Sequence, residues 1–353
     1  MSFDNGLIDL RSDTVTHPTP AMREAMYRAE VGDDVCDEDP TVNRLQERAA
    51  ALTGHEAALF VASGTMGNLL ALQTHCARFA RGVEVIVGNK SHIYLNETGG
   101  MAALVGAQAY SLPNQPDGTV LLDDIEAAIR VEDPHHPRTR LVCLENTHNQ
   151  CGGVPLTPDY TEQVADLAHS RGLLLHIDGA RIFNAAVAQG VDVKALTAPA
   201  DSVMFCLSKG LGAPVGSLLC GSKDFIYEAK RYRKMVGGGM RQVGVIAAAG
   251  NVALDSMIER LDDDHTNAKQ LADGLRAVPG LAVEPIAPTN MIYFGLAPSA
   301  KVSEQELVTR MQARGIVMYG SDAGRFRLVT HAWISAADVA KVVGAFRESL
   351  STD

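Results

Sequence analysis

Residues 173–212 read LLLHIDGARIFNAAVAQGVDVKALTAPADSVMFCLSKGLG, and they carry the strongest indication of the fold class. Its two apolar runs, residues 173–177 and 202–206, predict buried strands, because near-continuous apolar character is typical of strands covered on both faces. The residues between them leave room for one helical crossover. Asp178 follows the first run and Lys209 follows the second. A strand–helix–strand unit of this kind indicates a parallel sheet with functional side chains at its carboxyl edge.

The same alternation of short apolar runs with helical patterns extends in both directions. A helix is expected over residues 159–171, and further strands are expected over residues 57–61, 83–87, 107–111, 141–145 and 216–220. Such alternation predicts an α/β fold with a mainly parallel sheet.

The pattern changes after about residue 240. We expect helices over residues 242–261, 266–278, 304–314 and 336–350, and strands over residues 291–295, 315–319 and 326–330. The sequence therefore predicts a large domain over residues 1–240, N-terminal segment included, and a smaller C-terminal α/β domain over residues 241–353. The helix at about 242–261 would link the two.

Composition excludes some classes of function. The chain has 353 residues and a formal charge of −11, which argues against nucleic acid, since phosphate binding needs a basic face. Membrane insertion is not expected, because no apolar run approaches the roughly 20 residues of a membrane helix. The N-terminus lacks basic and apolar signal-peptide regions, and the cysteines form no C-x-x-C pair. A cytoplasmic protein with reduced thiols is expected.

A small-residue turn, Ser63-Gly-Thr-Met-Gly-Asn68, directly follows the strand expected at 57–61. Backbone N–H groups at the start of a helix form a natural seat for a phosphate, and the hydroxyls of Ser63 and Thr65 could add donors. The alternative interpretation is an ordinary N-cap with a tight turn.

Three further side chains stand at the ends of expected strands. Asp178 could pair with a protonated ring nitrogen of a ligand, with the small Ala180 letting a flat ring approach; alternatively it caps the next helix. Lys209 lies among glycines and apolar residues, where burial makes an amine competent for an imine, although a lysine that snorkels from a loop fits too. His92 could stack on a ring or move a proton, or it could be structural.

The order phosphate turn, His, Asp-x-x-Arg and Ser-Lys is that of a fold-type I pyridoxal-phosphate enzyme. The chain resembles the low-specificity L-threonine aldolases nearly from end to end, from Asp9 to His331. The motifs that carry the resemblance are Leu10-Arg-Ser-Asp-Thr14, Glu145-Asn-Thr-His-Asn149, His176-Ile-Asp-Gly-Ala-Arg181, Ser208-Lys-Gly-Leu-Gly-Ala-Pro-Val-Gly216 and Gly237-Gly-Gly-Met-Arg-Gln242.

The resemblance implies an aspartate aminotransferase-like fold and a pyridoxal 5'-phosphate cofactor bound covalently to Lys209, with no metal. Asp178 would keep the cofactor's ring nitrogen protonated. Lys234 and Arg241 would reach the phosphate from a neighbouring subunit of a homotetramer, a dimer of dimers. The cofactor-binding residues implied within one chain are Ser63, Gly64, Thr65, His92, Asp178, Arg181, Ser208 and Lys209.

The resemblance also implies residues for the substrate, a β-hydroxy-α-amino acid cleaved to glycine and an aldehyde. Its carboxylate would be held by Ser12, Arg181 and Arg327, because a guanidinium suits bidentate contact. Arg327 is preferred to Arg325 because it directly precedes Leu328-Val-Thr-His331.

A second choice, between two adjacent histidines, concerns the residue near the substrate's β-hydroxyl. His135 is placed near the hydroxyl in preference to His136, on alignment with Arg138-Thr-Arg140. The base stays open among His92, His135 and a phosphate-bound water. Another fold-type I lyase, either a β-eliminating amino-acid lyase or an enzyme like serine hydroxymethyltransferase, is the alternative activity, and a non-catalytic carrier of the cofactor is the alternative class.

Overall fold

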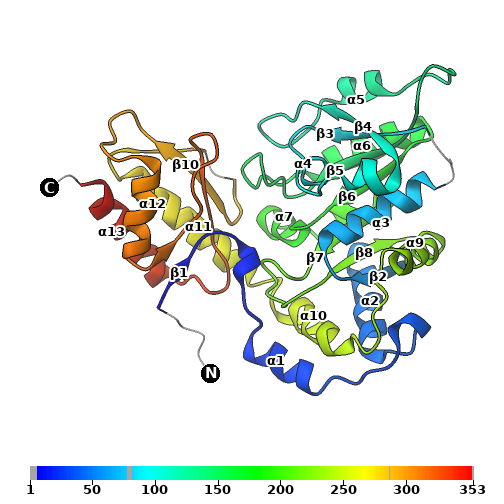
Figure 1. Cartoon of the computed structure of the whole chain (residues 1–353), viewed down its shortest axis with the longest axis horizontal. Coiled ribbons are helices and arrows are strands. Elements are labelled where there is room, and N and C mark those ends of the chain that lie inside the picture. The colour runs from blue at the N-terminus through cyan, green and yellow to red at the C-terminus, as the bar shows by residue number, and fades with distance from the viewer. Residues whose placement is uncertain (1–5, 78–81, 286, 352–353) are drawn as a thin grey trace. The chain divides into compact units, whose positions relative to one another are not determined.

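Seven strands form the central sheet of the larger of two units in the computed structural model of the chain (Figure 1). The structure describes residues 6–77, 82–285 and 287–351. The larger unit is His17–Ile258, and the smaller combines residues 6–16 with the described residues from Glu259 onward.

The sheet of the larger unit has the strand order β2-β8-β7-β6-β5-β3-β4. Only β8 runs antiparallel to its neighbours in this sheet, so the expected α/β class with a mainly parallel sheet is confirmed. The strands are β2 (Ala57–Val61), β3 (Val83–Gly88), β4 (Ala107–Leu112), β5 (Arg138–Glu145), β6 (Leu174–Asp178), β7 (Ser202–Cys206) and β8 (Ser217–Gly221).

Helices cover this sheet, and α3 (Gly64–Cys76) and α9 (Lys223–Met235) pack together over one part of it. Their apolar side chains form one cluster with alternate residues of the strands beneath, such as Leu59, Met204 and Leu219. The other α-helices of at least five residues in the described part of this unit are α1 (Pro20–Tyr27), α2 (Pro40–Thr53), α5 (Leu122–Ala128), α6 (Pro158–Ser170), α7 (Ile182–Gln189), α8 (Val193–Thr197) and α10 (Gly244–Ser256).

Two glycines let α3 approach β7 closely. A Cβ atom at Gly67 would lie 2.5 Å from Met204 Cγ, and one at Gly64 would lie 2.9 Å from Cys206 Sγ. Neither distance leaves room for a side chain without a shift of its neighbour. The glycines therefore bring the start of α3 beside the end of β7, which positions the site described below.

The smaller unit is an α/β unit with two small sheets. An antiparallel sheet has the order β12-β10-β9, and β1 pairs in parallel with β11. A core that includes Leu10, Phe294 and Phe346 lies between the strands and the helices. The elements are β1 (Ile8–Asp9), α11 (Leu261–Arg276), β9 (Leu281–Val283), β10 (Met291–Leu296), α12 (Glu304–Ala313), β11 (Ile316–Val317), β12 (Phe326–Val329) and α13 (Ala336–Leu350).

The chain divides at different residues from those that the sequence predicts. The sequence predicts that the N-terminal segment belongs with residues 1–240, but β1 pairs with β11 and thereby belongs to the smaller unit. The helix expected at 242–261 ends at Ser256, and α10 packs on α1 and α2 in the larger unit. Local periodicity does not reveal such long-range contacts. Among the described residues, no helix is both long and apolar enough to cross a membrane.

Candidate active site

The ends of five strands bring polar side chains to one edge of the large sheet. Strands β2, β3, β5, β6 and β7 point the same way, so their carboxyl ends meet at this edge, where open α/β sheets bind ligands. A cavity of about 200 Å³ lies there within the larger unit. It is lined by Ser63, Gly64, Thr65, Asn68, His92, Glu97, Asp178, Ala180, Met204, Cys206, Ser208 and Lys209.

Lys209 and Ser208 enter this cavity from the turn that follows β7. The turn closes with a hydrogen bond from Gly212 N to the Lys209 carbonyl, 2.9 Å long, and Gly212 has a φ of +75°, which favours glycine. A half-buried amine at this edge is a suitable nucleophile for a carbonyl ligand.

The start of α3 supplies anion-binding groups. Ser63 caps the helix, and its Oγ accepts a hydrogen bond from Met66 N at 3.1 Å. The first N–H groups of a helix have no partner within the helix and carry the positive end of its dipole. The cavity therefore has a seat for a phosphate at Ser63, Gly64 and Thr65, and its chemistry fits a phosphorylated ligand.

Asp178 is the last residue of β6 and is only 2% exposed. Its Oδ1 accepts from Ala180 N at 3.1 Å, and its Oδ2 accepts from Asn68 Nδ2 at 2.9 Å. The same Asn68 nitrogen donates to Glu97 Oε1, also at 2.9 Å. Two buried carboxylates thus share one amide donor beside the cavity, an arrangement that suits a cationic ligand group.

His92 begins α4 (His92–Leu95), and Glu145 at the end of β5 fixes its backbone: His92 N donates to Glu145 Oε2 at 2.6 Å. The ring Nδ1 lies 3.1 Å from Glu97 Oε1, and this hydrogen bond raises the pKa of His92 against the opposing effect of burial. Burial raises the pKa of Glu97. The charges of Asp178 and Lys209 also act on His92, so the candidate catalytic groups lie close enough to influence one another.

A metal cation would be an alternative occupant of the part of the cavity that Glu97 and Asp178 line. Potential ligand atoms of His92, Glu97 and Asp178 lie within 4.8 Å of one another. Asn68 already donates to both carboxylates, and a metal ion would have to displace that amide. The donor set as built suits a protonated nitrogen better than a metal.

Three other residues of the expected site are not among those that line this cavity. Ser12 and Arg327 belong to the smaller unit, where Arg327 Nη2 donates to the Arg11 carbonyl at 3.3 Å, next to Ser12. The structure thus brings these two expected carboxylate ligands together. Arg181 is 7% exposed and immediately precedes α7 in the larger unit.

His135 is not brought into the cavity of its own chain. It is exposed, bonded through Nδ1 to Asp133 Oδ1 at 2.7 Å, and it precedes the first residue of β5. The cavity lies beyond the last residue of that strand, at Glu145. At about 3.3 Å per residue, the strand separates the two ends by more than 20 Å. The role predicted for His135 is therefore not supplied within one chain.

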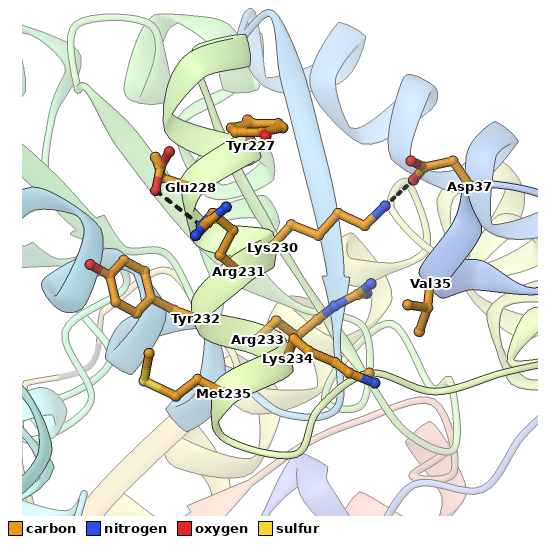
Figure 2. Close-up of a pocket in the computed structure, with 11 residues that line it drawn as sticks. Val35, Asp37, Tyr227, Glu228, Lys230, Arg231, Tyr232, Arg233, Lys234 and Met235 are labelled. Carbon is orange, nitrogen blue, oxygen red and sulfur yellow. Dashed lines mark hydrogen bonds and ion pairs between the residues drawn. The ribbon is translucent and has the colours of Figure 1, made fainter.

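Lys234 and Arg241 lie on a different surface. Lys234 lines a hollow of about 710 Å³ along α9, which Figure 2 shows with Val35 and Asp37 on its far side. Arg241 is exposed and pairs with Asp33 at 2.6 Å. Beneath this face, buried Arg233 pairs with Asp34 at 2.8 Å. Neither Lys234 nor Arg241 lines the cavity of its own chain.

Asn68, Glu97 and Glu145 are residues of this site for which the sequence predicted no role. Asn68 lies one turn after Gly64 on α3, so this spacing was the only available signal that its side chain shares a face with the phosphate turn. Glu97 contacts Asn68 of α3, and Glu145 contacts His92 of α4; local sequence does not specify such long-range contacts.

The fold is that of the fold-type I pyridoxal-phosphate enzymes. A solved structure described as a threonine aldolase from Leishmania major matches with a TM-score of 0.81 and 21% identity, covering 98% of this chain and 100% of that one. The family described as beta-eliminating lyase matches residues 9–297.

Curated relatives match over nearly their full length. The chain is 48% identical to low-specificity L-threonine aldolase 1 of Arabidopsis thaliana, over 98% of this chain and 97% of the relative. It is 46% identical to the low specificity L-threonine aldolase of Escherichia coli (strain K12), over 98% and 100%. The chain therefore belongs to the beta-eliminating lyase family, among the low-specificity L-threonine aldolases.

Proposed function

We propose that this protein cleaves β-hydroxy-α-amino acids reversibly to glycine and an aldehyde, with pyridoxal 5'-phosphate as its cofactor. L-Threonine, L-allo-threonine and phenylserine are the proposed substrates. The observation that carries the proposal is the convergence of Lys209, buried Asp178 and the start of α3 on one cavity. The names of the relatives agree with this chemistry.

The residues of the cavity fit the cofactor group by group. Lys209 provides the amine for its aldehyde, Asp178 a carboxylate for its protonated ring nitrogen, and the start of α3 the N–H groups for its phosphate. Ser208 lines the same cavity. When bound, the cofactor supplies an electron sink for the carbanion that forms when Cα–Cβ cleaves.

The chain's own residues would bind the substrate and move its protons. Arg181, Ser12 and Arg327 are proposed to hold the carboxylate, which orients the Cα–Cβ bond. His92 is proposed to stack on the cofactor. His92 lines the cavity and is also the candidate base for the substrate's β-hydroxyl. Its Nδ1 is hydrogen-bonded to Glu97 Oε1. A neutral His92 would accept the hydroxyl proton through Nε2.

The second candidate is a β-eliminating amino-acid lyase, because the family description names that reaction. Elimination breaks a bond at Cβ to its leaving group and yields a 2-oxo acid and ammonia, whereas retro-aldol cleavage yields glycine and an aldehyde. An enzyme like serine hydroxymethyltransferase would differ again by its need for folate.

We also propose a homotetramer in which Lys234 and Arg241 contribute to a neighbour's phosphate site. Lys234 lies on the face of α9 (Figure 2), and neither Lys234 nor Arg241 lines the cavity of its own chain, which supports a role in another subunit. Mixing Lys209→Ala with Arg241→Ala subunits should restore part of the activity if sites are shared. A fully active monomer would contradict the proposal. A cytoplasmic location is proposed with it, in keeping with six cysteines that form no disulfide among the described residues.

The deciding experiment measures products without added folate. Purified protein should release aldehyde and glycine from L-threonine, L-allo-threonine or phenylserine, and ammonia should stay at background. Borohydride should fix the cofactor on Lys209 in peptide mapping, and Lys209→Ala should lose the bound cofactor's visible absorbance and nearly all turnover. Ammonia with a 2-oxo acid as the main products would favour the second candidate. Label on another lysine would overturn the assignment of Lys209.

A further inference from the structure

A chain of buried polar side chains runs from the cavity into the core of the larger unit. Asn68 Oδ1 lies 3.1 Å from His176 Nε2, and His176 Nδ1 lies 2.8 Å from Ser202 Oγ. The Ser202 oxygen also lies 2.7 Å from His75 Nε2. Asn68, His176 and Ser202 are fully buried, and His75 is 8% exposed. None of the three residues behind Asn68 lines the cavity.

The two carboxylates determine which way the Asn68 amide faces. Asp178 and Glu97 accept hydrogen bonds when ionised, and both oxygens lie 2.9 Å from the Asn68 nitrogen. The amide has two N–H groups, one for each carboxylate. Its oxygen must then face His176, so His176 Nε2 has to carry a proton.

The directions of the remaining hydrogen bonds in this network follow from the number of protons that each group carries. Burial lowers the pKa of His176 to about 4 and that of His75 to about 3, so both rings are neutral at pH 7. With its proton on Nε2, His176 accepts at Nδ1 from the single Ser202 hydroxyl proton. Ser202 therefore accepts from His75 Nε2–H, and the His75 ring is held by stacking on Phe225 at 4.5 Å.

We propose that Asn68 is a positioning residue, locked in one orientation by His75, Ser202 and His176 so that its amide holds Asp178 and Glu97 side by side. Without this donor the two carboxylates, which lie within 4.8 Å of each other, would repel and one would rotate or take up a proton. The role deepens the proposed function and rests on it, because an oriented, ionised Asp178 is what the cofactor's ring nitrogen requires.

Two substitutions of one residue separate positioning from simple packing. In His176→Gln the new amide nitrogen lies near the former Nε2 and can still donate to Asn68. In His176→Asn the amide lies near the former Nδ1, reaches Ser202 and leaves Asn68 Oδ1 without its donor. Both variants keep a buried amide, so a general loss of stability should affect them alike. Asn68→Leu removes the donor itself at similar volume.

The first measurement is cofactor affinity, from titration of the cofactor-free full-length protein with pyridoxal phosphate. Asn68→Leu and His176→Asn should raise the dissociation constant by about ten- to a hundredfold, as expected for a lost hydrogen bond to a charged group. His176→Gln should stay within about threefold of the wild type. Equal losses in the two His176 variants, at matched melting temperatures, would overturn the proposal.

The second measurement needs no cofactor. The ¹⁵N shifts of His176 in the full-length protein should show a neutral ring protonated at Nε2, with a cross-peak to the Asn68 side chain. A ring protonated at Nδ1 would overturn the proposal. If wild-type protein fails to bind the cofactor while this tautomer is observed, the proposed function is wrong, but the hydrogen bonds that orient Asn68 are confirmed.

Discussion

Arg325 makes a two-pronged ion pair with Glu284: its Nε and Nη2 donate to the two carboxylate oxygens at 2.6 and 2.7 Å. The guanidinium also lies 3.7 Å from the centre of the Tyr293 ring. The neighbouring candidate, Arg327, instead reaches the backbone next to Ser12. Arg325 therefore has its carboxylate within the chain, which favours Arg327 as the residue for a substrate carboxylate.

Arg327→Lys should lower kcat/KM severely, because lysine keeps the charge but cannot make a bidentate contact. The expected loss corresponds to about 2–5 kcal/mol. Arg325→Lys is the matched control on the same strand and should change kcat/KM little. Steady-state kinetics on L-allo-threonine tests both, and the visible absorbance of the bound cofactor should survive in each. A sensitive Arg325 with a tolerant Arg327 would assign the role to Arg325.

Glu97→Gln should lower the pKa of His92, because the hydrogen bond to Glu97 is the main cause that raises it. The protonated ring stabilises the fold below its ordinary pKa of about 6.5, and this contribution disappears as pH rises through the higher folded value. The wild type should thus exceed Glu97→Gln in stability most below about pH 6.5, with the difference declining as the pH rises through the raised pKa of His92. Histidine NMR titration and urea unfolding at several pH values measure it.

The control for this pH dependence is His92→Asn, in which the dependence should vanish whether or not Glu97 is present. The other charges that face His92 are Asp178, Glu145 and Lys209, and all three remain in these variants. An unchanged His92 pKa in Glu97→Gln would mean that Asp178, rather than Glu97, holds the proton on the ring.

Arg233→Met should destabilise the protein by about 3–5 kcal/mol, since it leaves the buried carboxylate of Asp34 uncompensated. The side chain of Arg233 is 2% exposed, pairs with Asp34 at 2.8 Å and donates to the Phe60 carbonyl at 2.7 Å. Arg231 and Glu228, an exposed pair on the same helix at 3.8 Å, provide the control (Figure 2). Arg231→Ala should cost about 0–1 kcal/mol in urea unfolding. Similar losses in the two variants would contradict the structural role of Arg233.

Gly67→Ala should destabilise the protein by about 1–3 kcal/mol, because the new methyl group would press on Met204 Cγ. Met204→Ala in the same chain should recover part of that loss. Gly344→Ala in α13 is the matched control, since a Cβ there meets nothing within 4 Å. It should stabilise by about 0.5–1 kcal/mol through helix propensity. Thermal unfolding distinguishes the three, and a neutral Gly67→Ala would show that α3 can move away from β7.

The class of the fold and the edge of the sheet where the site lies could both be predicted from local sequence patterns. Local patterns predict the strands, and four of the strands are each followed by one of four polar residues: Ser63, His92, Asp178 or Lys209. Because parallel strands have their carboxyl ends at the same edge of a sheet, these residues are expected to meet there. The strands predicted at 57–61 and 202–206 match β2 and β7 to the residue, because apolar runs bounded by turn residues carry their own signal.

Which polar side chains complete the site, and which do not line it, depends on long-range packing that local sequence does not report. Asn68 joins Asp178 from 110 positions away, and His135 is left beyond the opposite end of β5 from the cavity. The pairing of β1 with β11 likewise moves the N-terminal segment out of the predicted large domain. Periodicity reports only which face of an element is buried, whereas these outcomes depend on which elements become neighbours. That depends on packing between segments far apart in the chain.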